Sequence, residues 1–215
     1  MKLKQSENIW VLGIFLGATG LLAALTLTLV SRWTAKPIAE AQRQNQMAAL
    51  KKLALPEFDN DITSDSVDIG NMTFMAARKD GKLTGIAAKG VSNGGYGGAI
   101  EALVGFDASG NITAVQILSH KETPGLGAAV CERKFQKTIT NFTRPTPDTL
   151  PGNRILDQFN RRNAADSGKW KISKDGGEFE FRTGATVTSR AVVSLVNGIA
   201  ANFRKAKELL TQEKK

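Results

Sequence analysis

The chain has 215 residues, a formal net charge of +9, and only one cysteine and one histidine. Iron–sulfur clusters, structural zinc sites and c-type haems need more thiol or imidazole ligands than this, and a disulfide needs two cysteines. The basic residues are scattered among acids without a dense Lys/Arg tract, which argues against nucleic-acid binding. Redox chemistry in this chain would therefore depend on an organic cofactor.

The N-terminal part carries a long apolar stretch. Residues 9–30 contain no charged side chain, and a helix of that length is about 33 Å long, enough for a hydrocarbon core of about 30 Å. Trp10 and Trp33 lie at its two ends, where indoles prefer the membrane interface. The stretch is longer than a signal-peptide core, and no clear cleavage site follows it. We predict an uncleaved transmembrane helix at 9–30 after a tail at 1–8; basic residues at both ends leave its orientation open.

A second helix is expected between this span and the folded domain. Residues 35–55 are rich in helix formers, with Pro37 suited to a first helical turn and Pro56 to a stop. A weak apolar face is formed by Ile38, Ala41, Met47, Leu50 and Leu53. We interpret 31–56 as a stalk, usually a solvated element, and 57–215 as the domain.

The domain begins with two predicted β-hairpins, which turn at Lys-Asp-Gly and Ala-Ser-Gly-Asn. The four strands are expected at 72–78, 83–90, 99–107 and 112–120. Between the hairpins, residues 91–98 place four glycines around Tyr96. Such a loop allows a close approach to a ligand, but it serves equally as a bend or bulge.

The rest of the domain mixes turns, strands and helices. A tight turn into a short helix is predicted at 121–135, a proline-rich loop at 144–152, and a last strand pair around 170–173 and 178–183. Apolar residues then recur at steps of three and four, at Val192, Leu195, Val196, Ile199, Phe203, Ala206 and Leu210. The predicted fold class is α+β, a mainly antiparallel sheet packed by helices. Cys131 is expected to be a small buried hydrophobe, and His120 a satisfied core histidine.

Hydroxyl groups crowd the start of that last helix, in TGATVTS at 183–189. Thr188 or Ser189 could cap the helix, while Gly184 turns the chain and Ala185 keeps the corner tight. A helix N-terminus also attracts phosphate, because its N–H groups are unpaired and its dipole is positive there. The corner permits a phosphate-bearing cofactor without requiring one.

TGATVTS resembles the Ser/Thr-Gly-Ala-Thr flavinylation motif of the FMN-binding domain in ion-translocating electron-transfer complexes. Further stretches look like the G subunit of Rnf-type complexes, in the same order along the chain: LALPEFDND at 53–61, GYGGAIEALVGFD at 95–107 and SHKETPGLG at 119–127. The family usually has an aspartate three residues before the motif; this chain has Glu180 there.

The resemblance implies FMN attached through a phosphoester to Thr186 by a separate flavin transferase, which uses FAD. It implies no metal site and no catalytic residue in this chain. The other cofactor-binding residues it suggests are Thr183, Gly184, Ala185, Val187, Thr188, Ser189, Glu122, Thr123, Pro124, Gly125, Leu126, Gly127 and Tyr96. For the turn at 122–127 an ordinary structural role is equally compatible, and Tyr96 could cover the flavin or merely pack on the sheet.

The implied function is electron transfer through FMN in a complex that couples ferredoxin:NAD chemistry to Na⁺ or H⁺ transport. Its partners would be the other membrane and peripheral subunits, the flavin transferase and membrane lipid, with the domain on the periplasmic side of the inner membrane. Three alternatives stay open: the C subunit of a Na⁺-translocating NADH:quinone oxidoreductase, a membrane-tethered sensory or scaffold domain, and a domain that binds FMN only noncovalently.

Overall fold

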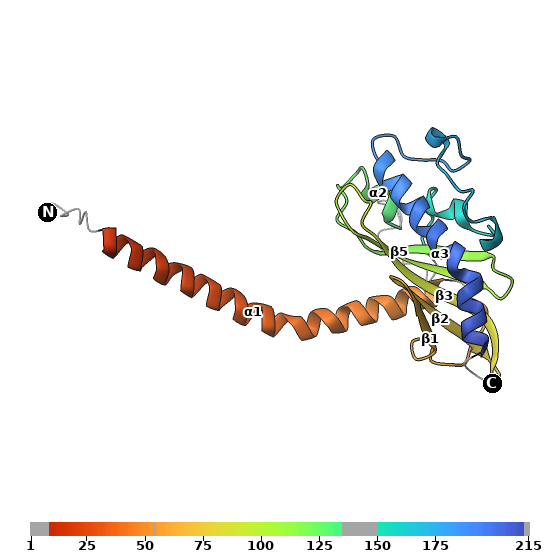
Figure 1. The fold of residues 1–215 in the computed structure, drawn as a ribbon, viewed down its shortest axis with the longest axis horizontal. Helices are drawn as coiled ribbons and strands as arrows, with labels where there is room; N and C mark the ends of the chain where they lie inside the picture. The colour runs from red at the N-terminus through yellow and green to blue at the C-terminus, as the bar shows by residue number, and fades with distance from the viewer. Residues whose placement is uncertain (1–8, 54, 135–149, 213–215) are drawn as a thin grey trace, which may run out of the picture. The chain divides into compact units, whose positions relative to one another are not determined.

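The computed structural model describes residues 9–53, 55–134 and 150–212 (Figure 1). The predicted tail at 1–8 and positions 144–149 of the predicted loop lie outside the described residues. The chain divides into two compact units, Met1–Asn45 and Gln46–Lys215. The first unit consists, in its described part, of α1; the second contains the last residues of α1 and the folded domain.

Helix α1 (Ile9–Lys52) contains the apolar stretch, and it is long and apolar enough to cross a membrane. The hydroxyls of Thr19, Thr26 and Thr28 donate to backbone carbonyls within the helix at 2.6–2.9 Å. These polar groups are therefore satisfied without water, as a hydrocarbon environment requires. The predicted helix start at Pro37 is wrong, because α1 continues through this residue, and the helix ends at Lys52 rather than next to Pro56.

Five antiparallel strands form one sheet in the order of the sequence. They are β1 (Ser66–Ile69), β2 (Met72–Lys79), β3 (Lys82–Ser92), β4 (Ile100–Asp107) and β5 (Ile112–Ser119). The two predicted hairpins are confirmed, and the first turns at Asp80 and Gly81, with φ of 51° and 75°. Strand β1 was not predicted, because it is short, alternates between exposed and half-buried residues, and includes Asp68.

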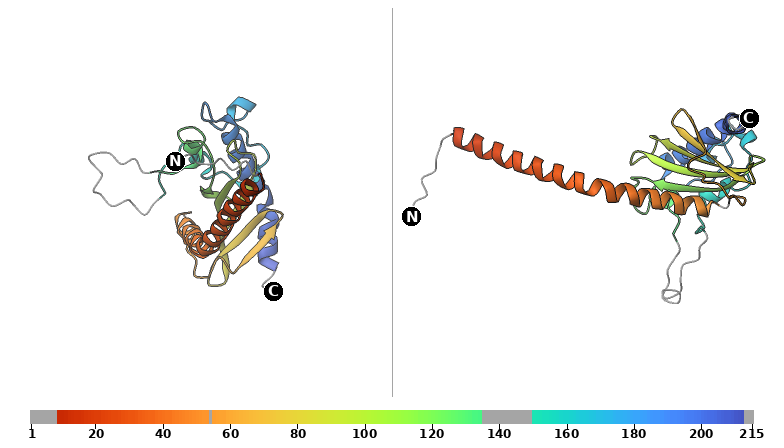
Figure 2. Two further views of the ribbon diagram at one scale, coloured as in Figure 1. Left: turned by 90° about the vertical axis from the view of Figure 1, so that its left-hand side faces the viewer. Right: turned by 90° about the horizontal axis from the view of Figure 1, so that it is seen from below.

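Both faces of this sheet are covered, which confirms the predicted fold class. Alternate side chains of β2 point to opposite faces of the sheet. Phe74 belongs to the core beneath α3 (Thr186–Gln212), and Met75 belongs to a smaller core on the other face. Figure 1 shows α3 crossing one face, and Figure 2 shows the end of α1 along the other. The predicted apolar stripe of α3 is buried at every position: Val192, Leu195, Val196, Ile199, Phe203, Ala206 and Leu210.

The end of α1 lies close to the sheet because small residues face it. Gly105 leaves room for the backbone of Leu53; a Cβ on this glycine would lie 3.1 Å from the Leu53 carbonyl oxygen. The Thr113 hydroxyl donates to the same carbonyl at 2.7 Å. Ala49, Leu50 and Leu53 are buried there. The final part of the predicted stalk is thus core rather than solvated surface.

The predicted strand pair around 170–173 and 178–183 is wrong. In its place the chain forms one short 3₁₀ helix, at Ser173–Asp175, and one isolated bridge, between Ile172 and Phe179. The short helices of the domain are α2 (Ala128–Cys131), η1 (Leu156–Phe159), η2 (Ala164–Asp166) and η3 (Ser173–Asp175). Phe179 packs on Phe159, with ring centroids 4.7 Å apart, and Trp170 lies 6.0 Å from Phe159. The apolar alternation that suggested a strand instead places Phe179 in this aromatic cluster.

Replacing Leu53 with alanine tests whether the end of α1 belongs to the domain core. Leu53 is fully buried, so the substitution should lower the free energy of unfolding by about 2–5 kcal/mol. Leu53 directly follows α1, and the control Met47→Ala removes an exposed side chain of that helix; it should cost less than about 0.5 kcal/mol. Denaturant titration of the full chain in detergent measures both; equal losses would contradict the packing.

Candidate functional site

The hydroxyl-rich corner is a tight turn leading into α3. Gly184 has φ of 81°, in the left-handed region that glycine tolerates. The buried Ala185 donates its N–H to the Arg182 carbonyl and accepts the Ser189 N–H, both at 2.9 Å. Thr186 is consequently the first residue of α3. The predicted capping role of Thr188 or Ser189 is wrong, because both are buried inside the first turn.

The four hydroxyls of this corner have different surroundings. The Ser189 hydroxyl accepts the Arg182 N–H at 3.3 Å, and the Thr188 hydroxyl donates to Glu122 Oε2 at 2.7 Å. Thr183 is exposed and Thr186 is half-buried. Neither makes a side-chain hydrogen bond within the described part of the chain, so two hydroxyls hold the fold and two are free.

Glu122 joins three segments at this corner. Its side chain is only 6% exposed. Besides the Thr188 hydroxyl, it accepts the Gly97 N–H at 3.1 Å, so the glycine loop, the turn at 122–127 and α3 meet at one carboxylate. Its backbone N–H donates to His120 Nδ1 at 3.2 Å. His120 is half-buried and hydrogen-bonded, in line with the predicted satisfied histidine.

Several positions around this carboxylate have space only for glycine. A Cβ on Gly127 would lie 2.2 Å from Glu122 Oε2, and one on Gly95 would lie 2.6 Å from Oε1. A Cβ on Gly97 would lie 2.0 Å from the Lys121 carbonyl oxygen. Contacts within the protein thus account for these glycines, which favours the structural interpretation of the loop at 91–98.

A cavity of about 370 Å³ opens at the corner, within the range of ligand pockets. We call it the corner cavity; it is lined by Tyr96, Glu122, Thr123, Leu126, Gly127, Gly184, Ala185, Thr186, Val187 and Thr188. Tyr96, Leu126 and Val187 are 77%, 47% and 45% exposed. Among the described residues after position 53, Phe58 is the one other large apolar side chain so exposed. Exposed apolar groups gathered around one cavity mark a site for a partly apolar ligand.

Every residue that lines the corner cavity is among the cofactor-binding residues that the family resemblance suggested. Of the other predicted site residues, Thr183 and Gly125 line a neighbouring cavity, Pro124 is exposed on the turn, and Ser189 is buried behind Ala185. Ser189 is placed to support the corner rather than to contact a ligand.

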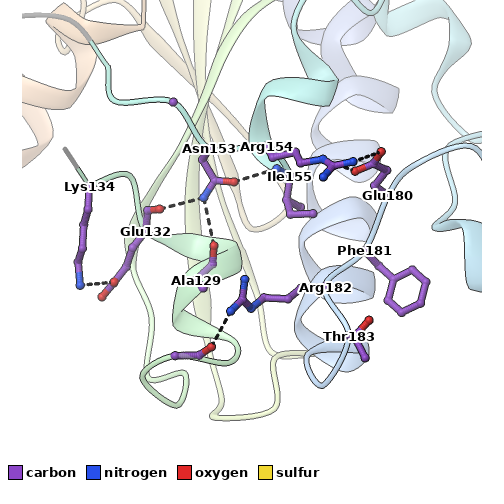
Figure 3. Close-up of a pocket in the computed structure, with 12 residues that line it drawn as sticks. Ala129, Glu132, Lys134, Asn153, Arg154, Ile155, Glu180, Phe181, Arg182 and Thr183 are labelled. Carbon is purple, nitrogen blue, oxygen red and sulfur yellow. Dashed lines mark hydrogen bonds and ion pairs between the residues drawn. The ribbon is translucent and has the colours of Figure 1, made fainter. Parts of the chain in front are cut away.

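The neighbouring cavity is larger, about 860 Å³, and has a more charged lining (Figure 3). Arg182 lines this cavity, and its Nη2 donates to the Gly125 carbonyl at 3.0 Å, so it joins the segment before α3 to the turn at 122–127. Arg154 pairs with Glu180 at 2.6 Å in the lining of the same cavity. Sequence reasoning missed Arg182, because a single cation before the motif does not show which carbonyl it reaches.

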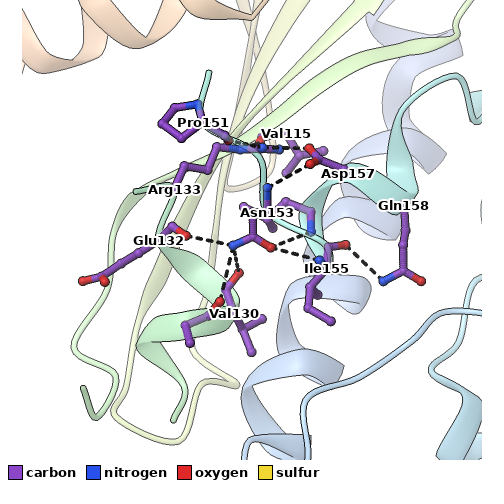
Figure 4. A network of polar contacts seen from close by, with 11 residues as sticks. Val115, Val130, Glu132, Arg133, Pro151, Asn153, Ile155, Asp157 and Gln158 are labelled. Atoms are coloured by element: carbon purple, nitrogen blue, oxygen red, sulfur yellow. Dashed lines mark hydrogen bonds and ion pairs between the residues drawn. The ribbon is translucent and has the colours of Figure 1, made fainter. Parts of the chain in front are cut away.

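A buried amide holds the wall of this larger cavity (Figure 4). Asn153 Nδ2 donates to the carbonyls of Val130 and Glu132 at 3.1 and 2.8 Å. Its Oδ1 accepts the N–H groups of Ile155 and Leu156 at 2.9 and 3.1 Å. One side chain therefore joins the end of α2 to the start of η1.

The lining of the corner cavity contains groups that could hold a flat aromatic ring and a phosphate. Tyr96, Leu126 and Val187 offer apolar surface to a ring, and the N-terminus of α3 offers unpaired N–H groups and a positive dipole to a phosphate. Cys131 is buried nearby, as predicted. Burial, and then the negative charges of Glu122 and Glu132, raise the pKa of its thiol to about 12. The thiol is thus protonated and unreactive at neutral pH.

Comparison with known proteins points to the same corner. The FMN-binding domain family matches residues 95–201, which include the glycine loop, the 122–127 turn and the start of α3. The chain is 34% identical to the G subunit of the ion-translocating oxidoreductase complex of Vibrio vulnificus, over 88% of this chain and 85% of that protein. The G subunits of the same complex from Stutzerimonas stutzeri and Cereibacter sphaeroides are 33% and 35% identical, over 87% and 93% of this chain and 77% and 87% of theirs.

Replacing Asn153 with alanine should destabilise the wall beside the corner. The change leaves buried backbone groups without partners and should lower the free energy of unfolding by about 2–3 kcal/mol. Asn160→Ala is the matched control, because this asparagine is exposed a short distance along the same segment. Denaturant titration compares the two variants; similar small losses would contradict the role of Asn153.

Proposed function

Because this chain belongs to the family of G subunits of ion-translocating oxidoreductase complexes, it is an electron-transport flavoprotein subunit with an FMN-binding domain, and we propose that it carries its FMN covalently on Thr186. The membrane partners, the attachment and the coupled reaction are part of this proposal.

The observation that carries the proposal is the free hydroxyl of Thr186. Among the hydroxyls that line the corner cavity near the start of α3, that of Thr188 is engaged by Glu122. Thr186 has no side-chain hydrogen bond within the described residues and lies at the first position of the helix. A phosphate bonded to its oxygen lies next to the N–H groups and dipole that favour negative charge. Thr183 is also free, but it lines the neighbouring cavity.

Attachment is a phosphoryl transfer from FAD carried out by a separate flavin transferase. The Thr186 hydroxyl oxygen attacks the phosphorus on the FMN side of the pyrophosphate and loses its proton to a base of the transferase. The bond from this phosphorus to the bridging oxygen breaks, and AMP leaves. The product is a threonine phosphoester of FMN, in which the redox-active ring stays free.

Bound FMN supplies reversible electron transfer, and the chain's own residues hold it. Tyr96, Leu126 and Val187 would offer apolar surface to its ring, and the backbone of the turn at 122–127 would hold its polar edge. In the complex, this relay would connect ferredoxin:NAD chemistry to the transport of Na⁺ or H⁺. The one apolar span carries no charged side chain, so other subunits would supply the ion pathway.

The same proposal places the chain in the inner membrane through α1, in contact with lipid. The domain from residue 57 onward would lie on the periplasmic side, and residues 1–8 in the cytoplasm. A covalent link suits that location, because it prevents the loss of FMN from an open compartment.

Thr186→Ala should abolish covalent flavin while leaving the fold intact. We expect in-gel fluorescence of the denatured protein, co-produced with a flavin transferase, for the wild type and for Thr183→Ala, but not for Thr186→Ala. Mass spectrometry of the intact chain should show the mass of one FMN phosphoester in the fluorescent forms. The transferase is shown to be active on another substrate. If the denatured wild type then gives no fluorescent band, but the native protein retains flavin, the binding is noncovalent.

The orientation can be measured with reporters joined after residue 215. Alkaline phosphatase, which is active only outside the cytoplasm, should be active, and a cytoplasm-dependent fluorescent reporter should be dark. The reverse pattern would contradict the periplasmic assignment without affecting the attachment of FMN.

A further inference from the structure

The acid at the centre of the corner differs from the other acids around the two cavities. Glu122 is the one carboxylate that is buried among the described residues. Its contacts there come from neutral donors, the Gly97 N–H and the Thr188 hydroxyl. By contrast, Glu180 pairs with Arg154 and Asp157 with Arg133. No ion pair neutralises Glu122 within the described part of the chain.

Holding the three segments together does not by itself require a charge. A glutamine in the same place could accept the Gly97 N–H through its amide oxygen and donate to the Thr188 hydroxyl through its NH₂ group. A buried carboxylate without a cation is costly, since burial disfavours charge. The neutral residue would thus do the same structural work at a lower cost, and the charge calls for a separate explanation.

The corner cavity supplies that explanation, because Glu122 lines it together with Thr186. A flavin reduced there would take up two electrons from a donor protein and one proton from water, and would become an anion. A fixed negative charge in the same cavity opposes this gain of negative charge. Two neutral hydrogen bonds disperse the charge of Glu122 without cancelling it.

We propose that Glu122 is a positioning residue whose buried, unpaired carboxylate lowers the reduction potential of the flavin held in the corner cavity. This inference rests on the proposed function. It assigns to one residue both the assembly of the site and the tuning of its redox equilibrium.

Glu122→Gln tests the charge with little change of shape. The variant is co-produced with a flavin transferase, and its midpoint potential is measured by equilibrium titration with dithionite and redox dyes at neutral pH. We expect the equilibrium constant for two-electron reduction to rise at least tenfold, a shift of about 30 mV. Glu208→Gln is the control, because Glu208 is exposed on α3 and about 33 Å along the helix from Thr186; its potential should match the wild type.

Thr188→Val separates the charge from the structural contact. Valine keeps the shape and removes one of the two donors, so the carboxylate remains with less of its charge dispersed. We expect the potential to fall, opposite in direction to Glu122→Gln, together with a lower melting temperature. If Glu122 acted only through its structural contacts, Glu122→Gln and Thr188→Val would shift the reduction potential in the same direction or leave it unchanged.

The outcomes distinguish this inference from the proposed function. Unchanged potential in Glu122→Gln, with covalent flavin present, overturns the inference and leaves the flavoprotein assignment standing. If Glu122→Gln takes up no flavin, Thr188→Val decides, and an unchanged or raised potential there overturns the inference. A wild type without covalent flavin overturns the attachment itself and is detected before any potential is measured.

Discussion

The site depends on one buried carboxylate that accepts hydrogen bonds from two distant parts of the chain. Glu122 lies 25 residues from Gly97 and 66 residues from Thr188, and its two oxygens bring these residues together. This contact leaves no space for side chains at Gly95 and Gly127. The glycines, the turn at 122–127 and the first turn of α3 are thus parts of one arrangement. Removing the carboxylate would affect all three, although each has an ordinary local conformation.

This arrangement explains why so many hydroxyls gather at one corner. Thr188 and Ser189 are used by the fold, the first by Glu122 and the second by the Arg182 N–H. Once they are engaged, the turn at Gly184 is fixed and Thr186 begins the helix with its hydroxyl free. The crowding is consistent with two roles in adjacent residues: one pair of hydroxyls builds the corner, and the hydroxyl of Thr186 stays free, as the proposed phosphoester requires.

The elements that could be predicted from the sequence are those whose signal is local. The stripe of α3 and the turn at Asp80 and Gly81 follow from spacing and backbone preference, and both agree with the structure. The error at 178–183 arose because apolar residues at every second position were interpreted as a strand. In the structure, Phe179 instead points inward and packs on Phe159. The burial of Glu122 could not be predicted, because its partners are distant in sequence. The lining of the corner cavity was predicted only through resemblance to a family.

The openness of the corner cavity is consistent with a tethered cofactor. A site that must retain a free ligand by affinity usually buries most of the ligand's surface, whereas Tyr96 and Leu126 are widely exposed here. Under the proposed phosphoester, retention no longer depends on affinity, because the tether keeps the ring at a high effective concentration near its cavity. The cavity can then remain shallow, leaving the ring edge accessible to electron donors and acceptors. It can also contain an acid such as Glu122, which would weaken the binding of a free anionic cofactor but cannot release one that is covalently attached.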